Sequence, residues 1–153
     1  MNRRDVLTGG AAMVLLAGRT DVALGQQAKV EKALQAATGG FAGGSKVVAL
    51  GKVPVERNPN GSERQDVIKG ELATGEAVSV HASGQQAGTQ PLLHTITHSE
   101  LIVVMEGELE FAHDGKLERA AAGDVIYVAY GTKHSVRNVA EGVTRYVVVQ
   151  VGA

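Results

Sequence analysis

Short apolar runs separated by turn residues dominate the chain after residue 45. Runs rich in Val, Ile and Leu predict strands at 47–50, 66–72, 77–81, 102–105, 108–113, 116–120, 124–129, 134–139 and 144–151. Turn chemistry lies between several of them, for example Asn-Pro-Asn-Gly at 58–61 and Thr-Gly at 74–75. No segment between them reads as a crossover helix. Many short and closely spaced strands therefore predict an all-β, antiparallel barrel or jelly roll.

One hairpin is predicted from local chemistry alone. Asp114-Gly115 joins two strand-like runs, and this dipeptide favours a two-residue type I′ turn with positive φ at its glycine. On the preceding run Glu108 and Glu110 alternate with Leu109. Since neighbouring side chains of a strand point to opposite faces, this strand has one wet and one buried face.

The first 25 residues have the layout of an export signal. Arg3 and Arg4 precede an apolar run at 6–17, and Ala-Leu-Gly at 23–25 offers a small-x-small cleavage site. About a dozen apolar residues are too few for a stable membrane span, which needs about 20. We therefore expect 1–25 to be a bacterial twin-arginine signal peptide and the protein to be periplasmic or secreted. A disordered basic start or an uncleaved anchor is the alternative.

The next segment, 26–45, reads as a leader and not as part of the strand region. Residues 29–37 have the propensity for about two turns of helix, and the glycines at 39, 40, 43 and 44 interrupt it. We expect 26–45 to be poorly ordered or weakly helical, and 46–153 to form one folded domain.

Composition limits which metal ligands and which partners the protein can have. The 153 residues suffice for one compact domain with a sizeable core. There is no cysteine, so any metal would have to bind histidines and carboxylates. The formal net charge of -1 and the low aromatic content of 3% argue against nucleic acid as a partner.

The candidate chemistry is concentrated in 88–138. His94, His98 and Glu100 have the same parity as Ile96, so a continuous strand would direct all of them to one side. Imidazole with carboxylate suits Zn, Fe, Ni, Cu or Mn, and His134 from a distant strand would complete such a site. The alternative is a set of polar residues on a solvated face. His81, on another strand, points either into a barrel mouth or to solvent.

Glycine, histidine and glutamate spacing in this stretch resembles the two motifs of small single-domain cupins, members of the cupin type-2 conserved barrel superfamily. The positions that match the first motif are Gly88, His94, Glu100 and Gly107, and those that match the second are Gly123, Gly131, His134 and Asn138. The fifteen residues between Gly107 and Gly123 also match the short inter-motif segment. The resemblance implies an antiparallel double-stranded β-helix over about 46–153.

The resemblance also implies a divalent transition metal, which would be Fe, Mn, Zn or Ni. His94, Glu100 and His134 occupy ligand positions of the family. Ile96 stands where the family has a further ligating histidine, and isoleucine cannot coordinate a metal. His98 would then serve as the fourth ligand or as a general base beside the metal. Ala129, where the family usually has proline, removes no ligand.

Two functions follow. The leading one is an exported, metal-dependent enzyme that acts on a small polar molecule in the barrel mouth, with oxygenase, isomerase and lyase chemistry not distinguished. The other is a metal-free module that binds a small molecule, with Ile96 and Leu93 lining an apolar pocket floor. The resemblance further implies a homodimer. Because one fold hosts many activities, the choice depends on the site.

Overall fold

The structure is a computed structural model that describes residues 40–41 and 44–153. The expected signal peptide at 1–25 and the expected helical stretch at 29–37 lie outside the described residues. Within the described part, no helix is long and apolar enough to cross a membrane.

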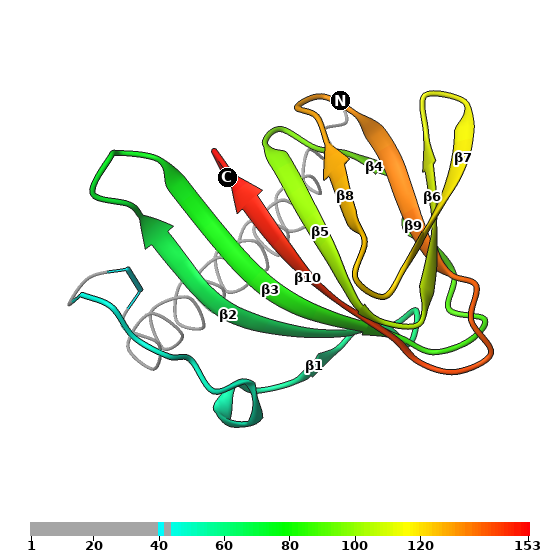
Figure 1. Ribbon diagram of the computed structural model, residues 1–153, viewed down its shortest axis with the longest axis horizontal. Helices are drawn as coiled ribbons and strands as arrows, with labels where there is room; N and C mark the ends of the chain where they lie inside the picture. The colour runs from blue at the N-terminus through cyan, green and yellow to red at the C-terminus, as the bar shows by residue number, and fades with distance from the viewer. Residues whose placement is uncertain (1–39, 42–43) are drawn as a thin grey trace, which may run out of the picture. The chain divides into compact units, whose positions relative to one another are not determined.

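Ten strands and one short 3₁₀ turn make up the described part of the chain (Figure 1). In chain order these are η1 (Leu50–Lys52), β1 (Glu56–Arg57), β2 (Glu63–Glu71), β3 (Ala77–Gln85), β4 (His94–Thr95), β5 (Ser99–Glu106), β6 (Glu108–His113), β7 (Lys116–Ala121), β8 (Val125–Val128), β9 (Lys133–Asn138) and β10 (Thr144–Val151). The prediction of an all-β fold is confirmed.

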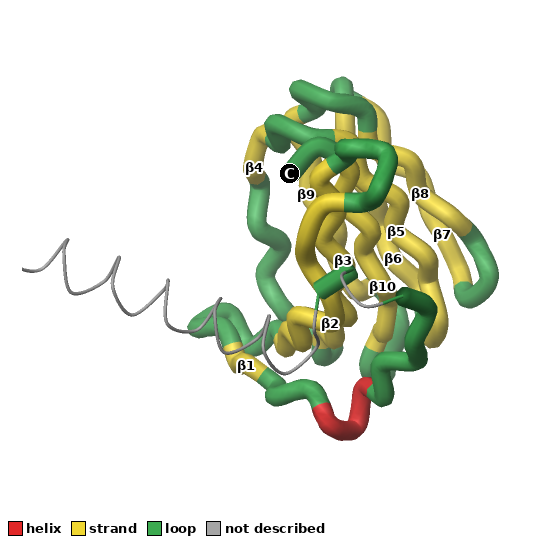
Figure 2. Tube along the Cα trace, turned by 90° about the vertical axis from the view of Figure 1, so that its left-hand side faces the viewer, coloured by secondary structure: helices red, strands yellow, loops and turns green. Residues whose placement is uncertain are grey.

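The strands form two sheets. One sheet has six strands in the order β1-β2-β3-β10-β5-β8, and the other has four in the order β4-β9-β6-β7. Every pairing in both sheets is antiparallel. Figure 2 shows the strands in yellow as stacked layers joined by loops. This is the double-sheet arrangement expected of a jelly-roll barrel.

Apolar side chains from the facing sides of the sheets form the core. Its buried members are Ile96, Ile102, Val104, Leu109, Phe111, Ala120, Ile126, Val128, Tyr146 and Val148. They alternate with outward-facing residues along β5, β6, β8 and β10, as the period of a strand requires. Burial of one such side chain contributes roughly 1.5–3 kcal/mol to folding. The core fills one part of the space between the sheets and leaves the rest for a cavity.

The predicted hairpin at Asp114-Gly115 is confirmed. Asp114 has φ 46° and Gly115 has φ 75°, and His113 pairs with Lys116 across the two-residue loop. Positive φ at both turn positions is the signature of the type I′ turn.

Two predictions about strands are wrong. Residues 47–50 are not a strand, since 46–49 have no regular structure and Leu50 opens η1. Residues 94–100 are not one continuous strand either, because β4 ends at Thr95 and β5 begins at Ser99. The bend at 97–98 carries the chain from the four-stranded sheet to the six-stranded sheet. This crossing decides how the candidate site is built.

Candidate functional site

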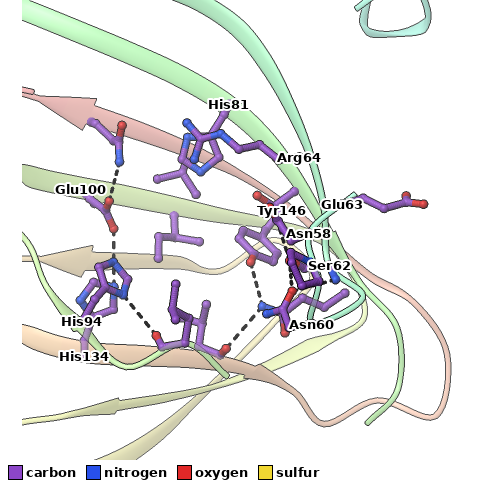
Figure 3. Close-up of a pocket in the computed structure, with 18 residues that line it drawn as sticks. Asn58, Asn60, Ser62, Glu63, Arg64, His81, His94, Glu100, His134 and Tyr146 are labelled. Atoms are coloured by element: carbon purple, nitrogen blue, oxygen red, sulfur yellow. Dashed lines mark hydrogen bonds and ion pairs between the residues drawn. The ribbon is translucent and has the colours of Figure 1, made fainter. Parts of the chain in front are cut away.

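A cavity of about 530 Å³ opens beside the core. Figure 3 shows its lining, which comes from strands of both sheets and from the turn before β2. The lining residues are Asn58, Pro59, Asn60, Ser62, Glu63, Arg64, His81, Ser83, Gln85, Leu92, His94, Glu100, Ile102, His134, Val136, Tyr146, Val148 and Gln150. Its volume lies within the usual range for small-molecule sites, about 300–1,000 Å³. The mixture of apolar walls with polar groups is also typical of such sites.

Two sheets contribute His94 and Glu100, which the sequence predicted to lie on one strand. His94 in β4 pairs with His134 in β9, whereas Glu100 in β5 pairs with Val128 and Gln150. Both side chains nevertheless line the same cavity. The shared-parity argument was therefore wrong in its geometry, although His94, Glu100 and His134 do meet.

Ile96 lies in the bend and belongs to the core. Its side chain is 2% exposed. Its backbone makes two hydrogen bonds with the loop between β8 and β9, since the Ile96 N–H donates to the Thr132 carbonyl and the Ile96 carbonyl accepts from the Gly131 N–H. It does not line the cavity, and neither does Leu93, which is exposed on a separate shallow surface. The expectation that Ile96 and Leu93 line a pocket floor was wrong.

One end of the cavity is formed by a carboxylate and two imidazoles. Glu100 and His134 are buried, and His134 Nε2 lies 3.6 Å from Glu100 Oε2. The rings of His94 and His134 are 4.7 Å apart and tilted by 51°. His94 Nδ1 lies 3.2 Å from the Leu92 carbonyl oxygen, so a proton on Nδ1 leaves Nε2 with a free lone pair. A separation of 3.6 Å is too long for a direct hydrogen bond, and an oxygen atom beside the pair, about 2.8 Å from each, can bond both groups.

His98 contacts the other oxygen of the same carboxylate. His98 Nε2 and Gln150 Nε2 each lie 2.8 Å from Glu100 Oε1, and the two nitrogens are 3.1 Å apart. The Gln150 amide donates to Glu100, and His98 either donates to Glu100 or accepts from Gln150, according to its tautomer. His98 is not among the residues that line the cavity. His98 therefore acts on a ligand in the cavity only indirectly, through its bond to Glu100.

The protonation states suit a polar ligand. Burial opposes ionisation of Glu100, but hydrogen bonds from Gln150 and His98 and the nearby imidazoles outweigh it, and the pKa is lowered. Burial and the neighbouring His94 lower the pKa of His134. At neutral pH this end of the cavity therefore offers an ionised carboxylate beside a neutral imidazole.

Several residues that line the cavity were not identified from the sequence. Gln150 and Tyr146 lie on a strand that the pattern predicted, and Arg64 lies on β2 just before the predicted run at 66–72, but none of the three belongs to a motif. The sequence did not decide whether His81 faces the barrel mouth or solvent. In the structure it is buried and lines the cavity. The inward parity of Tyr146 and Val148 on β10 was the one available signal, because Gln150 continues the same face.

A metal ion would find the right donor types here but not a formed site. His94, Glu100 and His134 supply nitrogen and oxygen ligands that suit a divalent transition metal. Among residues 40–41 and 44–153, however, no three His, Cys, Asp or Glu side chains are grouped so that they could hold an ion. The residues as arranged do not fit a bound metal, so no chemical step is derived through one.

The cavity and its two antiparallel sheets have counterparts in known proteins. Residues 81–150 match the family model described as the cupin domain. This part of the chain is similar to cupin domains. The match begins at His81 and ends at Gln150, so it includes His94, Glu100 and His134.

Solved structures of other proteins share this fold. An RmlC-like cupin from Shewanella frigidimarina has a TM-score of 0.57 at 20% identity, over 71% of this chain and 93% of its own. KdgF from a Halomonas species has a TM-score of 0.61 at 14% identity, over 71% and 94% of the two chains. An oxalate decarboxylase, predicted as such, from Thermotoga maritima has a TM-score of 0.58 at 19% identity, over 69% and 98%. A search of curated proteins gives no match. Similarity at this level concerns the fold alone.

Proposed function

We propose that the protein binds a small polar molecule in the cavity between its sheets, with Glu100 and His134 as the groups that recognise it. The observation that carries the proposal is the 3.6 Å gap between His134 Nε2 and Glu100 Oε2 in the wall of a cavity of about 530 Å³. A hydroxyl placed in the gap donates to the carboxylate and accepts from the imidazole. The cavity then binds polyhydroxylated or hydroxy-acid compounds of a few carbon atoms.

Burial makes this end of the cavity selective. Glu100 is 5% exposed and His134 is 1% exposed. A buried polar group left without a partner costs about 1–3 kcal/mol, so a ligand whose hydroxyl bonds both Glu100 Oε2 and His134 Nε2 gains affinity over one that does not. Compounds without a hydroxyl at this position are expected to bind more weakly.

Calorimetry with polyols and hydroxy acids tests the proposal. We expect His134→Gln and Glu100→Gln each to weaken binding at least about tenfold, because each removes one side of the gap. His113→Gln is the matched control, since His113 is a partly buried histidine that does not line this cavity. Equal affinities in wild type and in both cavity variants contradict the proposal.

The second candidate is a metal-dependent enzyme, an oxygenase, isomerase or lyase, in which His94, Glu100 and His134 bind Fe, Mn, Zn or Ni and His98 is a fourth ligand or a general base. Its support is that the Nε2 atom of His94 is free and its ring lies beside that of His134. Two donor atoms that bind one metal at about 2.0–2.2 Å lie roughly 3–4 Å from each other. When bound, a metal would supply Lewis-acid chemistry.

Metal content and one pair of variants separate the candidates. The metal-dependent enzyme predicts stoichiometric metal in purified protein and weaker retention in His94→Ala. His98→Ala weakens retention only if His98 is a ligand. Protein without metal that gains none from Zn, Mn, Fe or Ni at about pH 7 contradicts the metal-dependent enzyme.

We also propose that the protein is exported and that two copies pair. Export rests on Arg3, Arg4 and the cleavage pattern at 23–25. Pairing rests on apolar side chains on the outer face of the six-stranded sheet, where Leu101 lies opposite Tyr127 and both are exposed. Leu101→Asp is then expected to shift the protein from dimer to monomer in light scattering, and an unchanged mass would contradict this pairing.

A further inference from the structure

The cavity has a second polar end, formed by β2 and β3. Arg64 on β2 pairs with Ser83 on β3, and Asp66 pairs with His81, so these side chains share one face of the six-stranded sheet. Arg64, His81 and Ser83 all line the cavity. Figure 3 shows the Arg64 side chain running alongside the His81 ring, away from the labelled His94 and His134.

Arg64 is fixed by one bond and keeps donors for another. Its Nε donates to Asp66 Oδ1 at 2.7 Å. Within residues 40–41 and 44–153 this is the one bond that the guanidinium makes, which leaves the terminal nitrogens Nη1 and Nη2 for a ligand. Guanidinium groups bind planar carboxylates through two such donors at once. The Asp66 contact holds the side chain in place and so reduces the ordering cost of that interaction.

His81 lies beside this guanidinium with hydrogen-bonding capacity unused. It is 6% exposed, and its Nδ1 is buried without a partner among the described residues. Burial and the Arg64 charge lower its pKa to about 4, so the ring is neutral at neutral pH and has both a donor and an acceptor. A ligand in the cavity can use the donor without the cost of charging a buried imidazole.

The other polar groups at this end set the orientation and the charge of the ligand. Glu63 lines the cavity but is paired with Arg57 at 3.2 Å, and Asn58, Asn60 and Ser62 of the adjoining turn are neutral. Glu100 lines the same cavity and bonds His98 and Gln150 but, among the described residues, no Arg or Lys side chain. An anionic ligand group is therefore repelled from Glu100 and attracted to Arg64.

We propose that the ligand is a small hydroxy acid whose carboxylate binds Arg64 and His81, while its hydroxyl lies between Glu100 and His134. This assignment of the ligand class rests on the proposed function of the cavity. Because the Arg64–Asp66 pair has no net charge, a singly charged carboxylate is opposed less at this end than a doubly charged phosphate ester.

Calorimetry on the full-length protein tests the ligand class with matched probes. The probes are glycolate, lactate, malate and gluconate, the primary amides of these acids, and glycerol phosphate. We expect at least one acid to bind about tenfold or more tightly than its amide and than glycerol phosphate. Arg64→Gln is expected to remove this preference and to leave the weak binding of the amide unchanged. Arg64→Lys, which keeps the charge but loses the fork of donors, is expected to be intermediate.

The controls separate this inference from the proposed function. Arg119→Gln removes a guanidinium from an exposed ion pair with Glu108, outside the cavity, and is expected to bind like wild type. His81→Leu is expected to weaken the acid more than the amide. Melting midpoints check that each variant is folded.

The ligand class is overturned by equal affinity for acid and amide, by stronger binding of the phosphate ester, or by no effect of Arg64→Gln. If neutral polyols still bind and still need Glu100 and His134, the proposed function stands and the carboxylate assignment falls. Failure of every acid to bind contradicts the assignment as well.

Discussion

Single residues decide what this cavity can do, and the sequence predicted them unevenly. His94, Glu100 and His134 were identified from motif spacing, and all three line the cavity. Ile96 was expected to face the site because it shares parity with His94, yet it is buried in the core. Parity holds only along an unbroken strand, and β4 ends at Thr95, one residue before Ile96. Gln150, which bonds Glu100, has no sequence signature because one amide on a strand resembles any other.

At the scale of single residues, the buried His81 makes the stability of the fold depend on pH. Its pKa falls from 6.5 to about 4 because of burial and the Arg64 charge, with Asp66 and Glu100 acting in the opposite direction and His98 in the same one. Between these values the unfolded chain binds a proton that the folded protein does not, so stability falls as pH decreases from 6.5 to about 4 and is unaffected by this group above 6.5. The shift corresponds to about 3 kcal/mol.

Urea denaturation at a series of pH values measures this effect. We expect His81→Gln to lose less stability than wild type between neutral pH and about pH 4.5, because glutamine does not titrate. His134, whose pKa is also lowered by burial, keeps part of the slope in the variant. Parallel curves for wild type and variant would contradict a neutral, buried His81.

At the scale of elements, patterning predicted most strands and local chemistry predicted one turn. The predicted bounds of β6 and β10 agree with the structure, because both strands alternate cleanly or have turn residues at their ends. The strand predicted at 47–50 was wrong because a short apolar run alone does not distinguish a strand from other extended chain. The two-residue β4 could not be predicted, since its pairing with β9 depends on a partner about 40 residues away in sequence.

Gly107 shows how a motif glycine serves packing between elements. It has φ 78°, and a Cβ built there would lie 2.4 Å from Thr144 Oγ1 and 3.0 Å from Thr144 Cα. Thr144 is fully buried, and its hydroxyl bonds Asn138 and the Glu108 carbonyl, so it has no room to move. The glycine is therefore required both for its backbone conformation and for the close approach of β10.

Alanine substitutions at Gly107 and Gly115 separate these two requirements. Gly115 has φ 75° but open space around its Cβ position. We expect Gly115→Ala to cost about 1 kcal/mol from backbone strain alone, and Gly107→Ala to cost at least about 2 kcal/mol more from the clash with Thr144. Chemical denaturation gives both values. Equal losses would show that the contact with Thr144 does not matter.

At the scale of the whole molecule, composition and strand spacing predicted an all-β barrel, and the two antiparallel sheets and the cupin match confirm it. The ligand could not be predicted, because it depends on how residues from β2, β3, β5, β9 and β10 meet around one cavity. Arg64 and Glu100 are 36 positions apart and become two ends of one site only when the sheet forms. Long-range pairing of this kind leaves no trace in local pattern.

Export is the prediction that concerns the chain before residue 46. Replacement of Arg3 and Arg4 by lysine is expected to retain the protein in the cytoplasm, because the paired arginines are the part of the signal that a twin-arginine translocase reads. Mass spectrometry of wild-type periplasmic protein is expected to find a chain that lacks about 25 residues. An intact Met1 in the periplasm would contradict cleavage, and undiminished export of the variant would contradict the route.

The central claim is that this cavity recognises its ligand with its own side chains. The most direct test is calorimetry of the hydroxy acids on protein stripped of metal with a chelator, beside protein incubated with Zn, Mn, Fe or Ni. The account predicts the same affinity in both preparations and a loss of about tenfold or more in His134→Gln. Binding that appears only after metal is added would contradict it and would make the metal-dependent enzyme the better description.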